Sequence, residues 1–288
     1  MDSSNPSKYS IEFFPPRSEV GESKLDTVHA ELGKLNPDFF SVTYGAGGST
    51  KSGTQQIVLR YQAAGSRCAP HLSFGGSNEE ELRQILQVYI DAGIKRLVAL
   101  RGDMPSGVGA AVQHSYANEL VEFIRAETGD HFHIDVACYP ETHPESNSYA
   151  SDVSFFKDKV DAGANSAITQ YFYNPDAYFR FVDYCQAAGI DIPIVPGIMP
   201  ITNYANLARF SASCGAQIPR WLNKRLTGFG DDKEGLRRFG IDVVTELCED
   251  LLQGGAPGLH FYSMNLSQAV TQIWTNLDLG NRPQRELL

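Results

Sequence analysis

Glu12 is the ionisable residue whose surroundings point most directly to chemistry. It lies in the segment IEFFPP at residues 11–16, where strand-like alternation places its carboxyl group on the face opposite Ile11 and Phe13. A carboxylate among aromatic side chains loses hydration, and this favours its protonated form. The position therefore suits a general acid. The alternative is a solvated carboxylate at the edge of a strand.

Polar side chains also follow the other β-like segments of the chain. The carboxyl ends of the strands in a parallel α/β barrel meet at one rim, where such barrels bind their ligands. We therefore expect these residues to form a ligand site. Each has a structural alternative: Asp103 could pair with Arg101, and His71 and His143 could be histidines bound by the backbone. The polar residues at these ends are Thr43, Tyr44, His71, Arg101, Asp103, Tyr139, His143, Gln170 and Tyr204.

Eight apolar or β-branched segments alternate with amphipathic stretches of helical length. In residues 79–93, for example, Leu82, Leu86 and Tyr89 recur at helical spacing, and Ser77 with Glu80 predicts a capping box. Strands that alternate with helices predict a parallel sheet, and eight units favour a closed barrel. The strand candidates are residues 10–16, 39–45, 67–74, 96–103, 132–140, 166–173, 192–200 and 258–265.

A longer helical region, residues 203–254, precedes the last strand candidate, and Asp231 or Asp232 is expected to begin its final helix. No linker, low-complexity tract or block of charge divides the chain. We therefore expect an α/β fold, a single (β/α)8 TIM barrel with extra helices before strand eight. It would form one catalytic domain over residues 1–288, with the barrel proper at about 10–277.

The composition is that of a globular protein, with 288 residues of which 42% are hydrophobic and 20% charged. A net charge of −10 argues against nucleic acid as a partner. No apolar run could span a membrane, and the first residues lack the apolar core of a signal peptide, so we expect a cytoplasmic protein. Five separated cysteines without a CxxC pair predict reduced thiols.

Glycine and histidine patterns give no cofactor motif by themselves. The glycines at 45–48 and 107–109 do not match GxGxxG, and the chain has no GxxxxGK[ST] motif. A dinucleotide would therefore have to be held by the barrel rim. His131 and His133 form an HxH pair without a matching set of ligands, so no metal is expected.

Several longer strings resemble one enzyme family. From Ile11 to about Leu277 the chain is similar to bacterial methylenetetrahydrofolate reductase, as the catalytic barrel only. Because the matching strings occur in order and at matching spacing, the resemblance is specific. They are EFFPPR at 12–17, SVTYGA at 41–46, APHL at 69–72, VALRGD at 98–103, YPE at 139–141, HPE at 143–145, DAGAN at 161–165 and AITQ at 167–170.

The resemblance implies a (β/α)8 barrel that binds FAD without a covalent bond. NADH or NADPH and 5,10-methylenetetrahydrofolate would use the same flavin face in turn, in a ping-pong reaction through flavin N5. The product would be 5-methyltetrahydrofolate for methionine synthesis. The resemblance also implies a homo-oligomer. It does not distinguish NADH from NADPH.

Site residues follow from the same resemblance. Glu12 would be the general acid that opens the folate imidazolidine ring to an iminium ion, and Asp103 would lie beside flavin and pterin. Gln170 would contact both substrates, as would Tyr204, where bacterial members often have Phe, so that the hydroxyl is a departure. FAD contacts would be Thr43, Tyr44, His71, Arg101, Gly102, Asp103, Tyr116, Ala117, Tyr139, His143, Asp152, Asp158 and Lys159.

Two alternative functions are consistent with a barrel of this fold. A non-catalytic flavin- or folate-binding barrel would keep the cradle and lose the acid, whereas Glu12, Asp103 and Gln170 are all present. A lyase or aldolase of the same fold would need a Schiff-base lysine or metal ligands at the strand ends, and none of the eight strand candidates ends in lysine.

Overall fold

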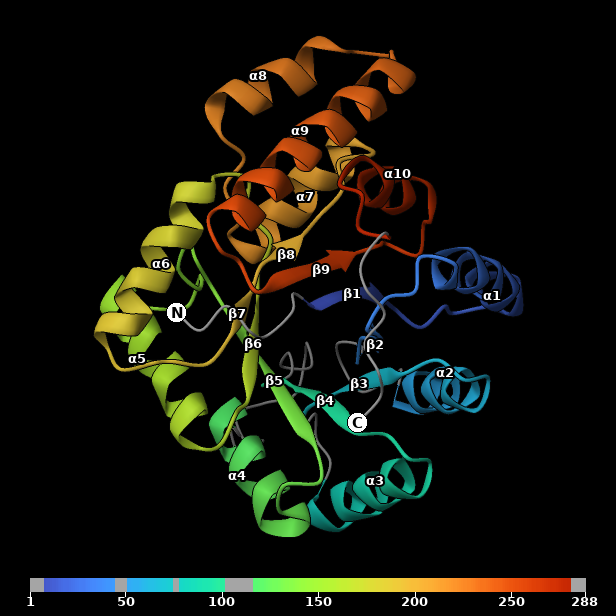
Figure 1. The fold of residues 1–288 in the computed structure, drawn as a ribbon, viewed down its shortest axis with the longest axis vertical. Coiled ribbons are helices and arrows are strands. Elements are labelled where there is room, and N and C mark those ends of the chain that lie inside the picture. Colours follow the sequence, from blue (N-terminus) through green and yellow to red (C-terminus); the bar gives the residue numbers. More distant parts are fainter. Residues whose placement is uncertain (1–7, 45–50, 75–77, 102–115, 281–288) are drawn as a thin grey trace, which may run out of the picture.

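The computed structural model describes residues 8–44, 51–74, 78–101 and 116–280. Its strands surround a common centre and its helices lie outside them (Figure 1). The strands are β1 (Lys8–Phe13), β2 (Phe39–Val42), β3 (Cys68–Leu72), β4 (Arg96–Ala99), β5 (His133–Cys138), β6 (Ser166–Thr169), β7 (Ile194–Val195), β8 (Gly197–Ile198) and β9 (Gly258–Tyr262).

Helices follow the strands in alternation, as the sequence predicts. They are α1 (Glu19–Gly33), α2 (Lys51–Ala63), α3 (Glu79–Asp91), α4 (Ala117–Thr128), α5 (Tyr149–Asp161), α6 (Pro175–Ala187), α7 (Tyr204–Cys214), α8 (Arg220–Gly228), α9 (Lys233–Gln253) and α10 (Gln268–Asn276). All pairs in the sheet are parallel, in the order β7-β6-β5-β4-β3-β2-β1-β9-β8. The predicted α/β barrel is confirmed.

The seventh predicted strand, residues 192–200, is divided at Pro196. Its first half, β7, pairs with β6, while its second half, β8, pairs with β9. Proline has no backbone N–H, so the ladder is interrupted there, and the nine strands correspond to the eight predicted. Gly197 follows directly, and a Cβ at this position would lie 2.2 Å from the Thr169 carbonyl oxygen. Any larger residue at this position would clash with the backbone of β6, so the change of partner strand requires glycine here.

Several strand and helix boundaries in the structure differ slightly from the predicted ones. Several strands end two or three residues before the sequence pattern does, and the residues left over form rim loops. Helix α3 is capped by Asn78, whose side chain accepts a hydrogen bond from the Glu81 N–H. The capping box predicted from Ser77 is therefore wrong, and Ser77 itself lies outside the described residues. Asp232 caps α9, as predicted.

The outward faces of the strands pack against the helices. On β1, Ile11 and Phe13 are completely buried, and Phe13 stacks on Phe40 of β2 with ring centroids 5.1 Å apart. Leu25 and Leu32 of α1 belong to the same core. Because side chains alternate along a strand, this packing turns the side chains of residues 10 and 12 to the inside of the barrel.

A polar cluster fills the barrel where β4, β5 and β6 begin. We call Arg96, His133, Asp135 and Ser166 the basal cluster. The Arg96 guanidinium donates two hydrogen bonds to the buried Asp135 carboxylate, at 2.6 and 2.9 Å, and lies over the Phe39 ring. Ser166 also donates to Asp135, and His133 lies 2.7 Å from Ser166 Oγ. Burial alone would raise the pKa of Asp135, but Arg96 and His133 outweigh it and hold the pKa well below its usual range.

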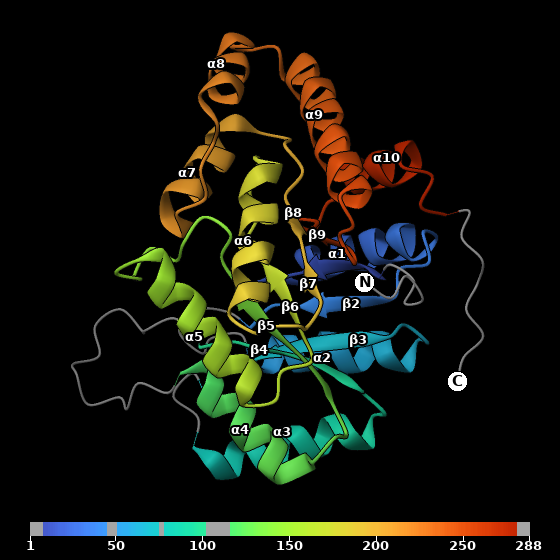
Figure 2. The same cartoon turned by 60° about the vertical axis from the view of Figure 1, so that its left-hand side comes forward.

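Three helices, α7 to α9, lie between β8 and β9, where the sequence predicts extra helices. They form the upper part of the molecule in Figure 2, with α7 beside the carboxyl ends of the strands. Tyr204 at the start of α7 donates a hydrogen bond to Asn223, which joins α7 to α8. Within the described residues, no helix combines the length and apolar character needed to cross a membrane.

Candidate active site at the carboxyl ends of the strands

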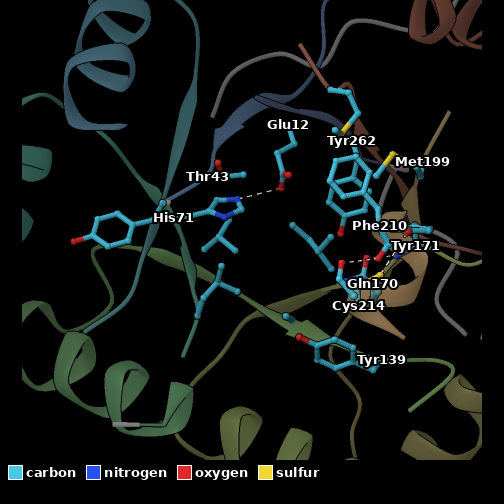
Figure 3. Close-up of a pocket in the computed structure, with 17 residues that line it drawn as sticks. Glu12, Thr43, His71, Tyr139, Gln170, Tyr171, Met199, Phe210, Cys214 and Tyr262 are labelled. Atoms are coloured by element: carbon cyan, nitrogen blue, oxygen red, sulfur yellow. Dashed lines mark hydrogen bonds and ion pairs between the residues drawn. The ribbon is translucent and has the colours of Figure 1, made fainter. Parts of the chain in front are cut away.

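A cavity of about 380 Å³ opens at the carboxyl ends of the strands. Side chains from the barrel strands, their rim loops and α7 line it (Figure 3). Six of the residues proposed from sequence are brought together here. The lining residues are Glu12, Thr43, Tyr44, His71, Val98, Leu100, Ala137, Tyr139, Ile168, Gln170, Tyr171, Met199, Phe210, Ser213, Cys214, Tyr262 and Met264.

Glu12 meets two histidines inside the barrel, and we call Glu12, His71 and His260 the mouth cluster. The Glu12 side chain is 18% exposed, and its Oε2 lies 3.3 Å from His71 Nε2 and 3.5 Å from His260 Nε2. His260 Nδ1 lies 2.7 Å from the Ser10 hydroxyl. Burial lowers the pKa of His71 although Glu12 opposes the shift, so His71 is neutral near pH 7. Glu12 therefore meets a neutral imidazole at His71.

Aromatic side chains form the opposite wall of the cavity. The Tyr262 hydroxyl donates to the Thr169 carbonyl, and the Tyr171 hydroxyl lies 3.0 Å from Ser211 Oγ. Burial raises the pKa values of both tyrosines, so both hydroxyls are neutral. Gln170 Oε1 accepts a hydrogen bond from the Tyr171 N–H, which fixes the amide plane. This wall can hold a flat ligand and exclude water.

Sequence reasoning missed most of this wall. Phe210 and Cys214 are four residues apart on α7 and thus share one helical face. That spacing marks a face, but only the position of α7 over the rim shows what the face covers. Tyr262 was also missed, although alternation along β9 puts it on the same side as His260 and could have indicated it.

Several predicted residues lie beside the cavity and do not line it. Arg101 follows β4 and forms an ion pair of 2.7 Å with Glu145, which raises the Arg101 pKa. Tyr116 caps α4, which begins at Ala117. The predicted Asp103 and Gly102 lie outside the described residues, so the suggested Arg101–Asp103 pair does too.

The proposed cofactor contacts on α5 hold the loop after β5. Asp152 is buried and accepts hydrogen bonds from the His143 N–H at 3.0 Å and from the Ser146 hydroxyl. The His143 ring meets the Tyr139 ring edge-on, with centroids 4.5 Å apart. This loop therefore gives Tyr139, which lines the cavity, a fixed support.

Lys159 and Asp158 lie near the end of the same helix. Lys159 Nζ donates to the Ala137 carbonyl oxygen at 2.6 Å, and burial lowers the Lys159 pKa. Asp158 is exposed. Tyr204 is half-buried and lies outside the cavity lining, with its hydroxyl bonded to Asn223. Among the described residues, no group of three His, Cys, Asp or Glu side chains could hold a metal ion.

Comparison with known proteins identifies the family to which this barrel belongs. A family model described as "Methylenetetrahydrofolate reductase" matches residues 2–278. The chain belongs to the methylenetetrahydrofolate reductase family. The 5,10-methylenetetrahydrofolate reductase of Pectobacterium carotovorum subsp. carotovorum is 40% identical over 275 residues, covering 95% of this chain and 90% of that protein. The enzyme of Escherichia coli (strain K12) is also 40% identical, covering 95% and 91%. The resemblance found in the sequence is thereby confirmed.

Plant relatives and one solved structure extend the comparison. "Methylenetetrahydrofolate reductase (NADH) 1" of Arabidopsis thaliana is 38% identical over 285 residues, which cover 94% of this chain and 48% of the plant protein. Proteins with these names are oxidoreductases, so this family consists of enzymes. A solved protein from Clostridium thermocellum, described as binding two copies of 5-methyl-5,6,7,8-tetrahydrofolic acid, has a TM-score of 0.66 at 16% identity and covers 96% of both chains. It shares the fold.

Proposed function

We propose that the chain, as one catalytic barrel domain, reduces 5,10-methylenetetrahydrofolate to 5-methyltetrahydrofolate with NADH or NADPH and uses FAD as its cofactor. The observation that carries the proposal is the arrangement of the cavity. A mostly buried carboxyl group, Glu12, lies on one side, and an aromatic wall with the Gln170 amide lies on the other. The names of the relatives support the folate and the nicotinamide.

The residues around the cavity fit FAD. Thr43, Tyr44 and Tyr139 line the cavity, and buried His71 Nε2 has no hydrogen-bond partner among the described residues. Such an atom is available to a ligand. Arg101 lies near Tyr116 at the start of α4, where a guanidinium and a helix N-terminus suit a diphosphate. Bound there, FAD would accept hydride from NADH or NADPH at N5 and return it to the folate. We keep Gly102, Asp103, Ala117, His143, Asp152, Asp158 and Lys159 as proposed contacts.

Glu12 supplies the proton for the folate step. Its carboxyl group transfers a proton to a nitrogen of the imidazolidine ring and becomes a carboxylate. The C–N bond to that nitrogen breaks, and the methylene carbon becomes an iminium carbon that accepts hydride. Proton transfer from a positioned acid contributes about 10²–10⁴-fold to a rate. Gln170 and the aromatic wall hold the pterin and keep water from the reactive carbon.

An anaerobic experiment tests the proposal. The purified protein should be yellow, and NADH or NADPH should bleach it. Adding 5,10-methylenetetrahydrofolate should then restore the yellow colour and yield 5-methyltetrahydrofolate. A protein that binds folate but shows no bleaching and recovery would be the non-catalytic binding barrel and would overturn the proposal.

A further inference from the structure

Two imidazole rings meet the same oxygen of Glu12, and their geometry differs. His71 Nε2 is nearer, at 3.3 Å, yet it makes no hydrogen bond with a described residue, because its alignment with the carboxyl group is poor. His260 Nε2 lies at 3.5 Å with hydrogen-bond geometry. The His260 contact is therefore the one that can orient the carboxyl group.

His260 is itself fixed from three sides. The residue is completely buried, and Ser10 Oγ lies 2.7 Å from its Nδ1. Its ring is nearly perpendicular to the Tyr262 ring, with centroids 5.3 Å apart, and lies 6.3 Å from the Phe39 ring. β9 pairs with β1 such that Ser10 is opposite His260. The register of the two strands therefore determines where the imidazole points.

Ser10 gives the second ring nitrogen of His260 a partner. When Glu12 is ionised, His260 Nε2–H donates to Oε2, and Nδ1 accepts from the Ser10 hydroxyl. When Glu12 carries its proton on Oε1, Oε2 still accepts from Nε2–H, and Nδ1 still accepts from Ser10. Both ring nitrogens of His260 are therefore paired in either state of the acid.

We propose that His260 is a positioning residue that, with Ser10, keeps Glu12 hydrogen-bonded before and after it gives up its proton. This inference rests on the proposed function, because it takes Glu12 as the acid of the folate step. In this arrangement Oε2 stays hydrogen-bonded to His260 and Oε1 faces the ligand. His260 forms no bond to substrate and keeps one tautomer through the step.

Other titratable groups face the same corner. His71 comes from β3, Tyr262 from β9, and the charge of Asp135 on β5 acts on His71. Burial lowers the pKa of His71 and raises that of Tyr262, so both are neutral near pH 7. A change in the pH profile near neutrality that appears on altering His260 is therefore assigned to the pair of Glu12 and His260.

Two amide variants of similar size separate positioning from packing. His260→Asn keeps a polar group near Ser10 but does not reach Glu12, whereas His260→Gln does reach it. Each holoenzyme is studied in single turnovers, with NADH and with 5,10-methylenetetrahydrofolate separately, across pH. The control is His133→Asn, because His133 also bonds a serine in the barrel but does not touch Glu12.

The expected result is selective. His260→Asn should slow the folate half-reaction about 10-fold or more and leave the NADH half-reaction within roughly twofold, while His260→Gln recovers roughly threefold of the loss. The alkaline limb of the folate half-reaction should move to higher pH in His260→Asn, since the ionised carboxylate loses a donor. His133→Asn should alter both half-reactions alike.

Equal losses in both half-reactions, or no difference between the Asn and Gln variants, would overturn the inference. If neither variant folds, Ser10→Ala gives the answer, because it keeps the imidazole and removes only its support. It should slow the folate half-reaction selectively, by a smaller factor. Glu12→Gln separates the two proposals: a spared folate half-reaction there overturns the proposed function, whereas a selective loss there with none at His260 overturns this inference alone.

Discussion

The basal cluster and the mouth cluster both place a carboxylate beside histidine inside the same barrel, yet they are bonded differently. Asp135 is completely buried. Its carboxylate accepts two hydrogen bonds from Arg96, at 2.6 and 2.9 Å, and another from the Ser166 hydroxyl. Glu12 is partly exposed, has contacts of 3.3 and 3.5 Å on one oxygen, and its Oε1 has no hydrogen bond within the described residues. Saturated contacts stabilise a fold, whereas a group left with free capacity can act on a ligand.

The largest expected effect tests the stabilising role of the basal cluster. Asp135→Asn leaves the Arg96 guanidinium inside the barrel without a charged partner, and breaking a buried pair costs about 3–5 kcal/mol. The free energy of unfolding, measured with urea, should fall by that amount. Asp161→Asn is the matched control, since Asp161 pairs with Lys157 on the surface of α5 and should contribute less than about 1 kcal/mol. Equal effects would remove the distinction between the clusters.

Glu12→Gln tests the chemical role of the mouth cluster. The amide keeps the size of the side chain but cannot act as an acid, so reduction of the folate should slow by about 10²-fold or more. The NADH half-reaction is the internal control and should be nearly unchanged. Rapid-mixing absorbance of the flavin measures both, and equal slowing of the two would argue against an acid at this position.

Acid should weaken the two clusters in different pH windows. Because burial lowers the pKa of His71, its stabilising contribution is complete above about pH 6.5 and is lost as the pH falls below that value. The pKa of Asp135 is lowered too, so its contribution persists down to about pH 4 and is lost below it.

Melting temperatures measured across pH should therefore show two descending segments. His71→Gln should reduce the slope of the first segment, and Asp135→Asn should reduce that of the second. Part of the first slope should remain in His71→Gln, because burial also lowers the pKa of His29. A single descent that neither variant changes would contradict the assignment.

The smallest effect concerns Tyr204, which bonds α7 to α8 beside the mouth. Tyr204→Ala should weaken NADH and folate alike, by roughly 1–3 kcal/mol, if the ring provides a stacking face. Tyr204→Phe keeps the ring and loses only the bond to Asn223, so both affinities should change by less than about 1 kcal/mol. Titration calorimetry with each ligand gives both values, and an effect on one substrate only would show separate sites.

Local sequence patterns predicted the strands and the orientation of Glu12 because both depend on alternation along one segment. The division of the seventh strand at Pro196 was not predicted, since its halves are defined by the strands they pair with. The partners of side chains were equally hidden. Arg101 pairs with Glu145 and Lys159 with the Ala137 carbonyl, and each contact joins segments far apart in sequence. The roles carried over from the family remain predictions.

The pairing of the last strand, β9, with the first has a consequence for how the chain reaches its folded state. Strands β1 to β7 each pair with a neighbour that precedes or follows it along the chain, so they can assemble as synthesis proceeds. The barrel closes only when β9 pairs with both β1 and β8. Ser10 then contacts His260, which lies 250 positions later in the chain. Until then β1 is an open edge that can pair with another chain. Nascent chains that stop short of β9 should therefore aggregate, and chaperone dependence should end abruptly when that strand is released.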